Sequence, residues 1–492
     1  MAKISIIGSG FSGLSAACYA AQAGHEVEVF EKNETLGGRA RSFSENGFMF
    51  DMGPSWYWMP DIFEKFFADF GKTPSDYYEL VKLSPSFQLF YKDHAPMVVP
   101  SELNDLYALF EGIEPGSADK LRKFLKEGEL KYTIAMDRLI YKPALSWKEY
   151  ASWDVLTGAL RTRIFQSMST HVRSYFKDER LISLMEFPVI FLGAMPDKIP
   201  ALYSLMNYSA FSMGTWYPMG GMCKIIEGMH KLALSLGVKF KTNAAVDEIA
   251  VLSNKAISVS SKSYAYKADA VVASADYHHV EKKLLGESDR NYTEDYWSKK
   301  VMAPSCLIFY LGVNKRINKL EHHNLFFDTD FNKHASQIYD KPQWPEDPLF
   351  YACCPTKTDS SVAPAGMENL FILIPLASGL EDNKELHDVY FNKVVQRLEK
   401  HCNENISEHL VYKRSYCSND FIADYNAFKG NAYGLANTLN QTAIFKPSIK
   451  NKHIENLFYT GQLTVPGPGV PPAIISGKIV VNEVLNYLKS KK

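Results

Sequence analysis

One segment near the start of the chain constrains its fold more than any other, because it has the order strand, glycine loop, helix, strand. Lys3 to Ile7 is a short apolar run that leads directly into a G-x-G-x-x-G loop from Gly8 to Gly13. The Ala-rich stretch from Leu14 to Ala23 has helical character, and His25 to Phe30 then alternates polar with apolar residues. With Glu31 at the end of the second strand, the segment is a complete βαβ unit and predicts a Rossmann-like α/β domain.

Each glycine of this loop has a physical function in binding a dinucleotide. Gly8 permits a tight turn, Gly10 has no side chain to block a pyrophosphate, and Gly13 lets the helix pack closely on the strand. The free N–H groups and the dipole of the helix face the phosphates, and the Glu31 carboxylate accepts hydrogen bonds from the adenosine ribose. A glycine-rich loop without a ligand is the alternative, but the complete order of elements favours a dinucleotide.

A second glycine pair follows the acidic residue and indicates which dinucleotide is bound. Gly37-Gly38-Arg39 stands just downstream of Glu31. A permanently held FAD threads past a second loop at this place, whereas an NAD that comes and goes does not require one. The pattern resembles the FAD-binding signature of the amine oxidase and carotenoid desaturase superfamily. It therefore predicts FAD rather than NAD as the cofactor.

The composition excludes some classes of protein. A formal net charge of −1 excludes a globally basic nucleic-acid binder. The 492 residues exceed what one core usually holds, so two or three substructures are expected. The seven cysteines are scattered along the chain without a zinc-like pair of C-x-x-C motifs, which is typical of free thiols in a reducing cytoplasm.

Neither a cleaved signal peptide nor a membrane-spanning helix is expected. Lys3 precedes apolar and small residues, but glycines interrupt this run at once, and the segment is needed to build the nucleotide site. The longest uncharged stretch, Ile199 to Cys223, contains Pro200, Asn207 and Pro218. These residues suit a buried or interfacial segment better than a lipid-exposed helix.

The interval from Ser117 to Arg180 predicts a helical region with a basic surface. It has 13 Lys or Arg residues against 8 Asp or Glu residues, with aromatic residues such as Trp147 and Trp153 between them. A charged helical segment is most often only a solvated face. The alternative is a surface that meets anionic lipid headgroups while its aromatic rings lie at the membrane boundary.

Two short motifs have competing interpretations. The aromatic run Trp56 to Trp58 follows the turn at Gly53 and forms either a small aromatic core or part of a tunnel wall for a substrate. The adjacent pairs His278-His279 and His322-His323 lack the i, i+4 spacing of a helical metal site. We therefore interpret these histidines as structural and expect no metal.

The C-terminal segment is predicted to close the site that the N-terminal segment opens. Asn456 to Gly461 has the pattern of a strand ending in a turn, and a loop of Gly and Pro residues precedes a helix from Ala473 to Leu488. The N–H groups of this helix can face the negative charge of a reduced flavin. Val238 to Phe240 and Ala245 to Ile249 are predicted to be strands that return the chain to the nucleotide sheet.

Together these motifs resemble the bacterial-type phytoene desaturases, an FAD-dependent family of carotenoid desaturases and isomerases, and the resemblance runs from Lys3 to the last helix. The amino-acid sequence around Asp51 to Tyr78 is most similar to that of one subgroup, the 1-hydroxycarotenoid 3,4-desaturases. The motifs that carry the resemblance are Gly8 to Gly13, Glu31 with Gly37 to Arg39, Asp51 to Ser55, Trp216 to Met222, Thr358 to Pro364, Asp420 to Gly430, and Gly461 to Pro471.

The resemblance implies an amine oxidase-like architecture in three parts. A discontinuous FAD-binding domain comprises residues 1–85, 215–290 and 430–492, a mixed-sheet substrate domain comprises 86–116 and 291–429, and a helical region at 117–214 lines the tunnel and contacts the membrane. The implied FAD contacts are Gly8, Gly10, Phe11, Ser12, Gly13, Glu31, Lys32, Gly38, Arg39, Gly53, Pro54, Ser55, Trp56, Val246, Gly461, Gly469, Val470 and Pro471. The implied tunnel residues are Tyr57, Trp58, Trp216 and Tyr217.

Two departures from the family pattern affect the acid–base chemistry. Many relatives carry Thr-His-Pro-Gly near the flavin, whereas this chain has Val465 at the position of that histidine. An Asp and Arg pair in the helical region is matched by Asp154, but Thr157 stands at the Arg position. Asp154 is therefore the candidate catalytic acid or base, without the second member of the pair.

The resemblance implies an enzyme that desaturates an acyclic carotenoid by hydride transfer to FAD, with quinone or oxygen as the electron acceptor. The first expectation is 3,4-desaturation of a 1-hydroxycarotenoid, and phytoene desaturation is the alternative. Because a polyene forgoes about 0.8 kcal/mol for each carbon unit left in water, we expect a cytoplasmic protein bound peripherally to the inner face of the cell membrane. An amine oxidase-like flavoenzyme and a non-catalytic carotenoid carrier remain open as more distant alternatives.

Overall fold

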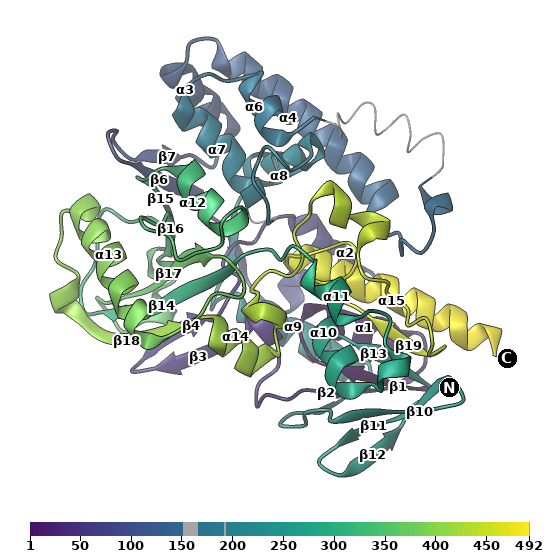
Figure 1. Cartoon of the computed structure of the whole chain (residues 1–492). Coiled ribbons are helices and arrows are strands. Elements are labelled where there is room, and N and C mark those ends of the chain that lie inside the picture. Colours follow the sequence, from purple (N-terminus) through teal and green to yellow (C-terminus); the bar gives the residue numbers. More distant parts are fainter. Residues whose placement is uncertain (151–165, 191–192, 492) are drawn as a thin grey trace.

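The computed structural model describes residues 1–150, 166–190 and 193–491. Figure 1 shows a layer of helices from residues 103–134 and 168–190 at one end of the molecule and a large sheet beside it. The nucleotide sheet lies at the other end, next to a small hairpin sheet. The candidate functional residues described below lie in the centre of the molecule, between these layers.

The nucleotide sheet is parallel and contains the predicted βαβ unit. In spatial order its strands are β19 (Leu457–Tyr459), β13 (Ala270–Ala273), β1 (Lys3–Ile7), β2 (Glu26–Phe30) and β9 (Lys239–Lys241). Four helices bury apolar faces in the same core as this sheet, namely α1 (Phe11–Gln22), α2 (Pro60–Ala68), α9 (Cys223–Ser235) and α15 (Val470–Ser490). The Rossmann-like fold predicted from the glycine loop is thus confirmed, with strands from both ends of the chain in one sheet.

One strand predicted for this sheet belongs elsewhere. The strand expected at Ala245 to Ile249 begins only at Glu248 and pairs in a separate antiparallel sheet of β10 (Glu248–Leu252), β11 (Lys255–Ser261) and β12 (Tyr264–Lys267). The turn between β10 and β11 has positive φ angles at both Ser253 and Asn254, 49° and 60°. Two consecutive residues of this kind make a tight hairpin, so each strand pairs with its sequence neighbour rather than with the parallel sheet.

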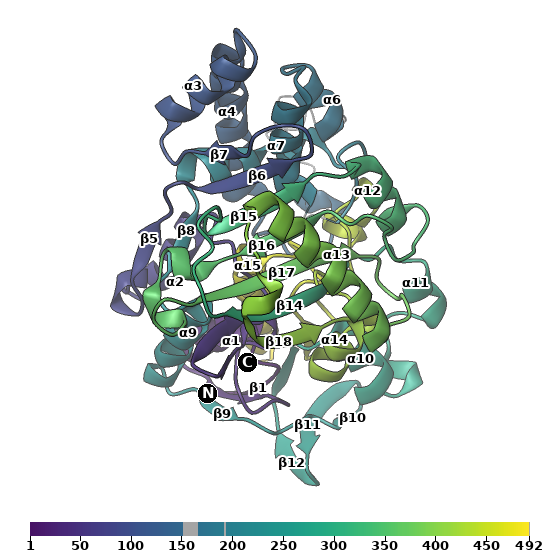
Figure 2. The same cartoon turned by 90° about the vertical axis from the view of Figure 1, so that its left-hand side faces the viewer.

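The large sheet is mixed and separates two cores. In spatial order its strands are β18 (Leu410–Tyr416), β14 (Ser305–Val313), β17 (Glu368–Leu376), β16 (Phe350–Cys353), β15 (His323–Phe327), β6 (Phe87–Tyr91) and β7 (Met97–Val99). The helix α13 (Lys384–Cys402) covers one face, which is turned towards the viewer in Figure 2. Because alternate residues of a strand face opposite sides, Leu307 and Phe309 pack under α13 while Cys306 and Ile308 face the centre of the molecule.

Helices from the middle of the chain cover the central face of the large sheet. They are α3 (Leu103–Ile113), α4 (Ser117–Ile134), α6 (Met168–Arg173), α7 (Glu179–Ile190) and the short α8 (Leu205–Asn207). The other strands and α-helices of the described residues are β3 (Ser42–Glu45), β4 (Phe48–Asp51), β5 (Leu80–Lys82), β8 (Trp216–Pro218), α10 (Tyr277–His279), α11 (Glu294–Ser298), α12 (Phe331–Tyr339) and α14 (Ser418–Tyr425). Among the described residues, no helix has the length and apolar character to cross a membrane. All seven cysteines are buried free thiols.

Candidate functional site

A connected cavity of about 1420 Å³ lies where the nucleotide sheet, the large sheet and the helical layer meet. Its walls include the β1–α1 loop, residues 37–40, residues 53–56 and the loop that precedes α15. An ordinary small-molecule site has a volume of roughly 300–1,000 Å³. The cavity therefore has room for a dinucleotide and for a second ligand beside it.

The β1–α1 loop has the geometry that a dinucleotide needs. A Cβ on Gly13 would lie 2.1 Å from the carbonyl oxygen of Gly8, so only glycine lets α1 approach β1 this closely. A Cβ on Gly10 would meet no atom within 4 Å, because this side of the loop faces the cavity. Gly10 is also the N-cap residue of α1 and offers no side-chain cap. The start of α1 is therefore open to a phosphate.

Glu31 stands at the end of β2, and hydrogen bonds fix its carboxylate beside the loop. It accepts from the Ser9 backbone N–H at 3.0 Å, from the Ser9 hydroxyl at 2.6 Å and from the Asn33 backbone N–H at 2.9 Å. The side chain is buried and lines the cavity. A carboxylate held in this way is suited to the ribose hydroxyls of a dinucleotide.

Two residues of the cavity wall have buried hydrogen-bond donors without a partner among the described residues. The Arg39 side chain donates from Nη2 to the carbonyl oxygen of Asn431 at 3.0 Å, while its buried Nε has no partner among the described residues. Trp56 Nε1 is also buried without a described partner. An unpaired buried donor costs about 1–3 kcal/mol. The open loop, the fixed carboxylate and these donors together fit FAD.

The loop before α15 approaches the cavity from the other end of the sequence. Gly461, Gly469, Val470 and Pro471 line the cavity, and Gly469 precedes the helix with a φ of 114°. No side chain caps this helix start, and its dipole favours negative charge there. Val465 also lines the cavity. The position at which many carotenoid desaturases have a histidine therefore carries no group that can transfer a proton.

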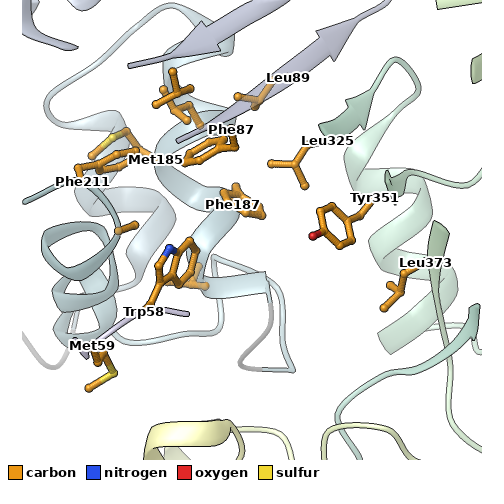
Figure 3. Close-up of a cluster of buried hydrophobic side chains, with 14 of the residues drawn as sticks. Trp58, Met59, Phe87, Leu89, Met185, Phe187, Phe211, Leu325, Tyr351 and Leu373 are labelled. Atoms are coloured by element: carbon orange, nitrogen blue, oxygen red, sulfur yellow. The ribbon is translucent and has the colours of Figure 1, made fainter. Parts of the chain in front are cut away.

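Another part of the cavity is lined mainly by apolar and aromatic side chains. We call it the apolar arm and define it by Trp58, Met59, Ile308, Tyr351 and Leu373. Trp58 and Met59 lie across from Tyr351 and Leu373 in Figure 3. Leu373 of β17 is paired with Ile308 of β14, and both side chains line the cavity. A polyene chain could contact apolar walls on both sides here.

The predicted cofactor residues, apart from Gly13, all line the cavity. Val246 is among them although it is distant in sequence from the glycine loops, and Lys32 reaches across to donate to the Ala423 carbonyl oxygen at 2.5 Å. Gly13 is instead buried within α1, on the side that packs against Gly8. The tentative catalytic residue Asp154 lies outside the described residues.

Three of the predicted tunnel residues have other positions. Trp58 lines the cavity, but Tyr57, Trp216 and Tyr217 are not among the residues that line it. Tyr57 is fully buried and stacks on Phe63, with 4.2 Å between the ring centroids. It packs in the core of the nucleotide sheet, whereas its neighbour Trp58 packs in the central core. We therefore assign Tyr57 to the core of the nucleotide domain.

The side of the cavity that the large sheet forms was not predicted from the sequence. Cys306, Ile308, Tyr351 and Leu373 come from strands whose residues are apolar on both faces, so the sequence does not show which side faces the cavity. Residues 442–445, before the C-terminal strand, also line the cavity. No local motif marks them, and only the fold brings them to the site.

His322 and His323 have structural contacts in the wall beside this site. His323 stacks on Trp56 with 4.0 Å between ring centroids, and its Nδ1 lies 2.6 Å from the Tyr351 hydroxyl. Burial lowers the pKa of His322 to about 3, so its imidazole is neutral at physiological pH. Cys353 lies within reach of both rings. His322 Nδ1 lies 2.8 Å from the Thr358 hydroxyl oxygen, so each ring is held by a hydrogen bond through its Nδ1, and we propose no metal here.

Comparisons with known proteins agree with this geometry. A family model described as flavin containing amine oxidoreductase matches residues 11–485. A carotenoid 3,4-desaturase of Haloarcula japonica is 40% identical over 476 residues, which cover 96% of each chain. A zeta-carotene-forming phytoene desaturase of Myxococcus xanthus is 30% identical, with 99% of this chain and 94% of the other covered.

The solved structure of an oxidoreductase from Methanosarcina mazei has the same fold. Its TM-score is 0.64 at 17% sequence identity, and the match covers 98% of this chain and 100% of the other. An amine oxidase-like fold was predicted from the sequence, and the family match confirms it. The chain therefore belongs to the flavin-containing amine oxidoreductases and, within them, to the FAD-dependent carotenoid desaturases.

Proposed function

We propose that this enzyme introduces the 3,4 double bond of an acyclic carotenoid that already carries a hydroxyl group at C1. The observation that carries the proposal is that the dinucleotide loops and the apolar arm line one continuous cavity. A flavin held by the loops would then lie beside a polyene held by the arm. The similarity to a carotenoid 3,4-desaturase supports the position of the new double bond. The resemblance of the sequence around Asp51 to Tyr78 to 1-hydroxycarotenoid 3,4-desaturases supports the hydroxylated substrate.

Bound FAD supplies a two-electron acceptor for hydride. In the substrate, one carbon of the saturated bond loses a hydride, its neighbour loses a proton, and the electron pair of the second C–H bond becomes the new double bond. The protein must hold this bond in register, because a shift by one carbon would desaturate a different position. Trp58 and Met59 on one side, with Tyr351 and Leu373 on the other, hold the chain and exclude water from the arm.

The proton that leaves the substrate needs an acceptor. Val465 lines the cavity where many relatives have a histidine, so the proton leaves to another base or to water. We propose Asp154 as this base, because it matches the Asp of the Asp and Arg pair of the family. Quinone or oxygen would serve as the acceptor of the two electrons that leave the enzyme after each turnover.

We further propose that the enzyme takes its substrate from the inner face of the cell membrane through one side of the cavity. Trp147 and Phe445 line the cavity and are 65% and 47% exposed. Their rings form an edge-to-face pair with centroids 5.5 Å apart. Leu145 is exposed next to them, and Lys142 and Lys148 add positive charge. Exposed aromatic rings beside lysines suit the boundary of an anionic bilayer.

Replacing both Trp147 and Phe445 with serine is expected to weaken binding to anionic phospholipid vesicles at least tenfold. Burial of each large apolar side chain contributes about 1.5–3 kcal/mol, and both contributions are lost. Flotation with vesicles at low and high salt measures the effect. Tyr264→Ser is the matched control, because Tyr264 is 71% exposed on β12, away from the cavity. Equal flotation of the double variant and the wild type would rule out this docking surface.

Product analysis tests the proposed reaction directly. The enzyme is expressed in cells that supply either a 1-hydroxylated acyclic carotenoid or phytoene, and the carotenoids are separated by chromatography. We expect a new double bond at the 3,4 position of the hydroxylated substrate and a much slower reaction of phytoene. Anaerobic addition of the substrate should bleach the flavin absorbance, which a carrier would not do. Peroxide release with simple amines would instead support an amine oxidase.

A further inference from the structure

A row of three hydrogen-bonded side chains ends at the cavity. The ring nitrogen Nδ1 of His323 lies 2.6 Å from the Tyr351 hydroxyl oxygen, and the Tyr351 hydroxyl donates to Ser55 Oγ at 3.0 Å. Because Tyr351 uses its single hydroxyl hydrogen for Ser55, the hydrogen between His323 and Tyr351 comes from Nδ1. The row therefore has one direction, from His323 through Tyr351 to Ser55.

Ser55 is the end of this row that a ligand can reach. His323 has no exposed surface and Tyr351 is 5% exposed, whereas Ser55 is only partly buried. Ser55 and Tyr351 both line the cavity, and in Figure 3 the Tyr351 hydroxyl points towards the side of the apolar arm that carries Trp58. Ser55 accepts one hydrogen bond from Tyr351 and keeps its own O–H and a second acceptor position. It can thus donate to a ligand and also accept from one.

The side chains of this row are uncharged. Burial raises the pKa of Tyr351 well above its ordinary value, so the phenol keeps its proton at physiological pH. Burial also lowers the pKa of His323 well below its ordinary value, so the imidazole is neutral. An ammonium or carboxylate group in an apolar arm would need an opposite charge, whereas a hydroxyl needs only a neutral hydrogen-bond partner. The row therefore favours an alcohol as its ligand.

The position of Ser55 matches the position of the hydroxyl in the proposed substrate. Ser55 belongs to the loop of residues 53–56, which lines the cavity and packs on the backbone of Arg39. Its hydrogen bond with Tyr351 joins this loop to the apolar arm, so Ser55 lies where the arm meets the proposed flavin site. In a 1-hydroxycarotenoid, only one methylene separates the hydroxyl-bearing carbon from the bond between C3 and C4. A group that binds this hydroxyl must accordingly lie close to the reacting bond.

We propose that Ser55 binds the C1 hydroxyl of the carotenoid, with Ser55 Oγ donating to the hydroxyl oxygen, and that Tyr351 and His323 orient Ser55 for this contact. The inference rests on the proposed 3,4-desaturation of a hydroxylated substrate. It moves Ser55, which the family resemblance implied as an FAD contact, to the substrate side of the cavity. The contact fixes which carbon–carbon bond lies against the flavin, and a substrate without the hydroxyl leaves the Ser55 O–H unpaired.

The test compares two acyclic carotenoids that differ only in the C1 hydroxyl. We measure kcat/KM with both substrates for the wild type, Ser55→Ala and Tyr351→Phe. The wild type is expected to prefer the hydroxylated substrate by about ten- to a hundredfold. Ser55→Ala should lower this preference about tenfold, because the donor is lost. Tyr351→Phe should lower it about threefold, because Ser55 keeps its hydroxyl but loses the group that orients it.

Tyr91→Phe is the matched control, because it removes the same atom from the same sheet. Tyr91 lies on β6, is 9% exposed, and donates to the Arg180 carbonyl oxygen at 3.1 Å. It packs in the same core as Tyr351 but is not among the residues that line the cavity. The control should keep the wild-type preference, so that a lower preference in Tyr351→Phe reports on the row and not on a general loosening of the core.

The outcomes separate this inference from the proposed function. A wild type without preference for the hydroxyl would overturn both the choice of substrate and the hydroxyl site. A wild type with the preference, and a Ser55→Ala variant that keeps it, would overturn the hydroxyl site alone. A preference that is lost in Ser55→Ala but unchanged in Tyr351→Phe would overturn the positioning role of Tyr351. Visible absorbance after gel filtration gives the flavin content, and loss of flavin from folded Ser55→Ala would also overturn the assignment, because Ser55 would then belong to the cofactor site.

Discussion

Gly10→Ala is expected to leave the fold intact and to weaken FAD binding at least a hundredfold. The new Cβ meets no protein atom within 4 Å, so the fold has space for it. The same space is where the start of α1 opens to the cavity, and a methyl group there would keep a pyrophosphate from the backbone N–H groups. The free energy of unfolding of the flavin-free protein should change by no more than about 1 kcal/mol.

Gly13→Ala is the matched control, because it makes the same chemical change three residues away. Its Cβ would lie 2.1 Å from the Gly8 carbonyl oxygen, so α1 must move away from β1. We expect about 3 kcal/mol of destabilisation even without flavin. Denaturant unfolding of both flavin-free variants and titration with FAD distinguish the two effects. If Gly10→Ala held FAD as tightly as the wild type, the β1–α1 loop would not be the phosphate site.

The nucleotide half of the molecule could be predicted from sequence because its determinants are local. A phosphate loop needs glycines at fixed spacing between one strand and one helix, and Gly8, Gly10 and Gly13 have that spacing. Glu31 follows at the end of the next strand, so its position is set by the same short segment. The resemblance to known desaturases extended this to the loop at Gly461 and to α15, which reach the site from the other end of the chain.

The substrate half could not be predicted in the same way because its contacts are non-local. Leu373 and Tyr351 reach the apolar arm from central strands that are buried on both faces, so their sequences lack the alternation that reveals a cavity side. Tyr57 was predicted to line the tunnel, but it packs in a different core from its neighbour Trp58, and the sequence does not show which core each ring joins. The hairpin turn at Ser253 had no glycine to mark it. These features appear only when distant segments are placed together.

Leu373→Trp is expected to lower carotenoid turnover at least a hundredfold while leaving the flavin content unchanged. Leu373 lies across the apolar arm from Trp58 in Figure 3 and keeps 8% exposure towards the cavity. An indole ring at this position extends into the arm, whereas the strand neighbours Ile372 and Ile374 face the opposite core. A conjugated polyene is stiff, and protein interiors are too densely packed to open a second route beside it.

Val389→Trp is the control for this substitution, because it adds the same ring at a position of α13 that is 49% exposed and lies outside the cavity. Visible absorbance gives the flavin content of both variants, and chromatography of the products gives their turnover. We propose that the loops at Gly10 and Arg39 hold FAD, and the substitution at Leu373 lies outside both loops. An indole ring that blocks the apolar arm should therefore prevent binding of the polyene without affecting binding of the flavin. Wild-type turnover by a Leu373→Trp enzyme with full flavin content would mean that the carotenoid reaches the flavin by a path that does not pass Leu373.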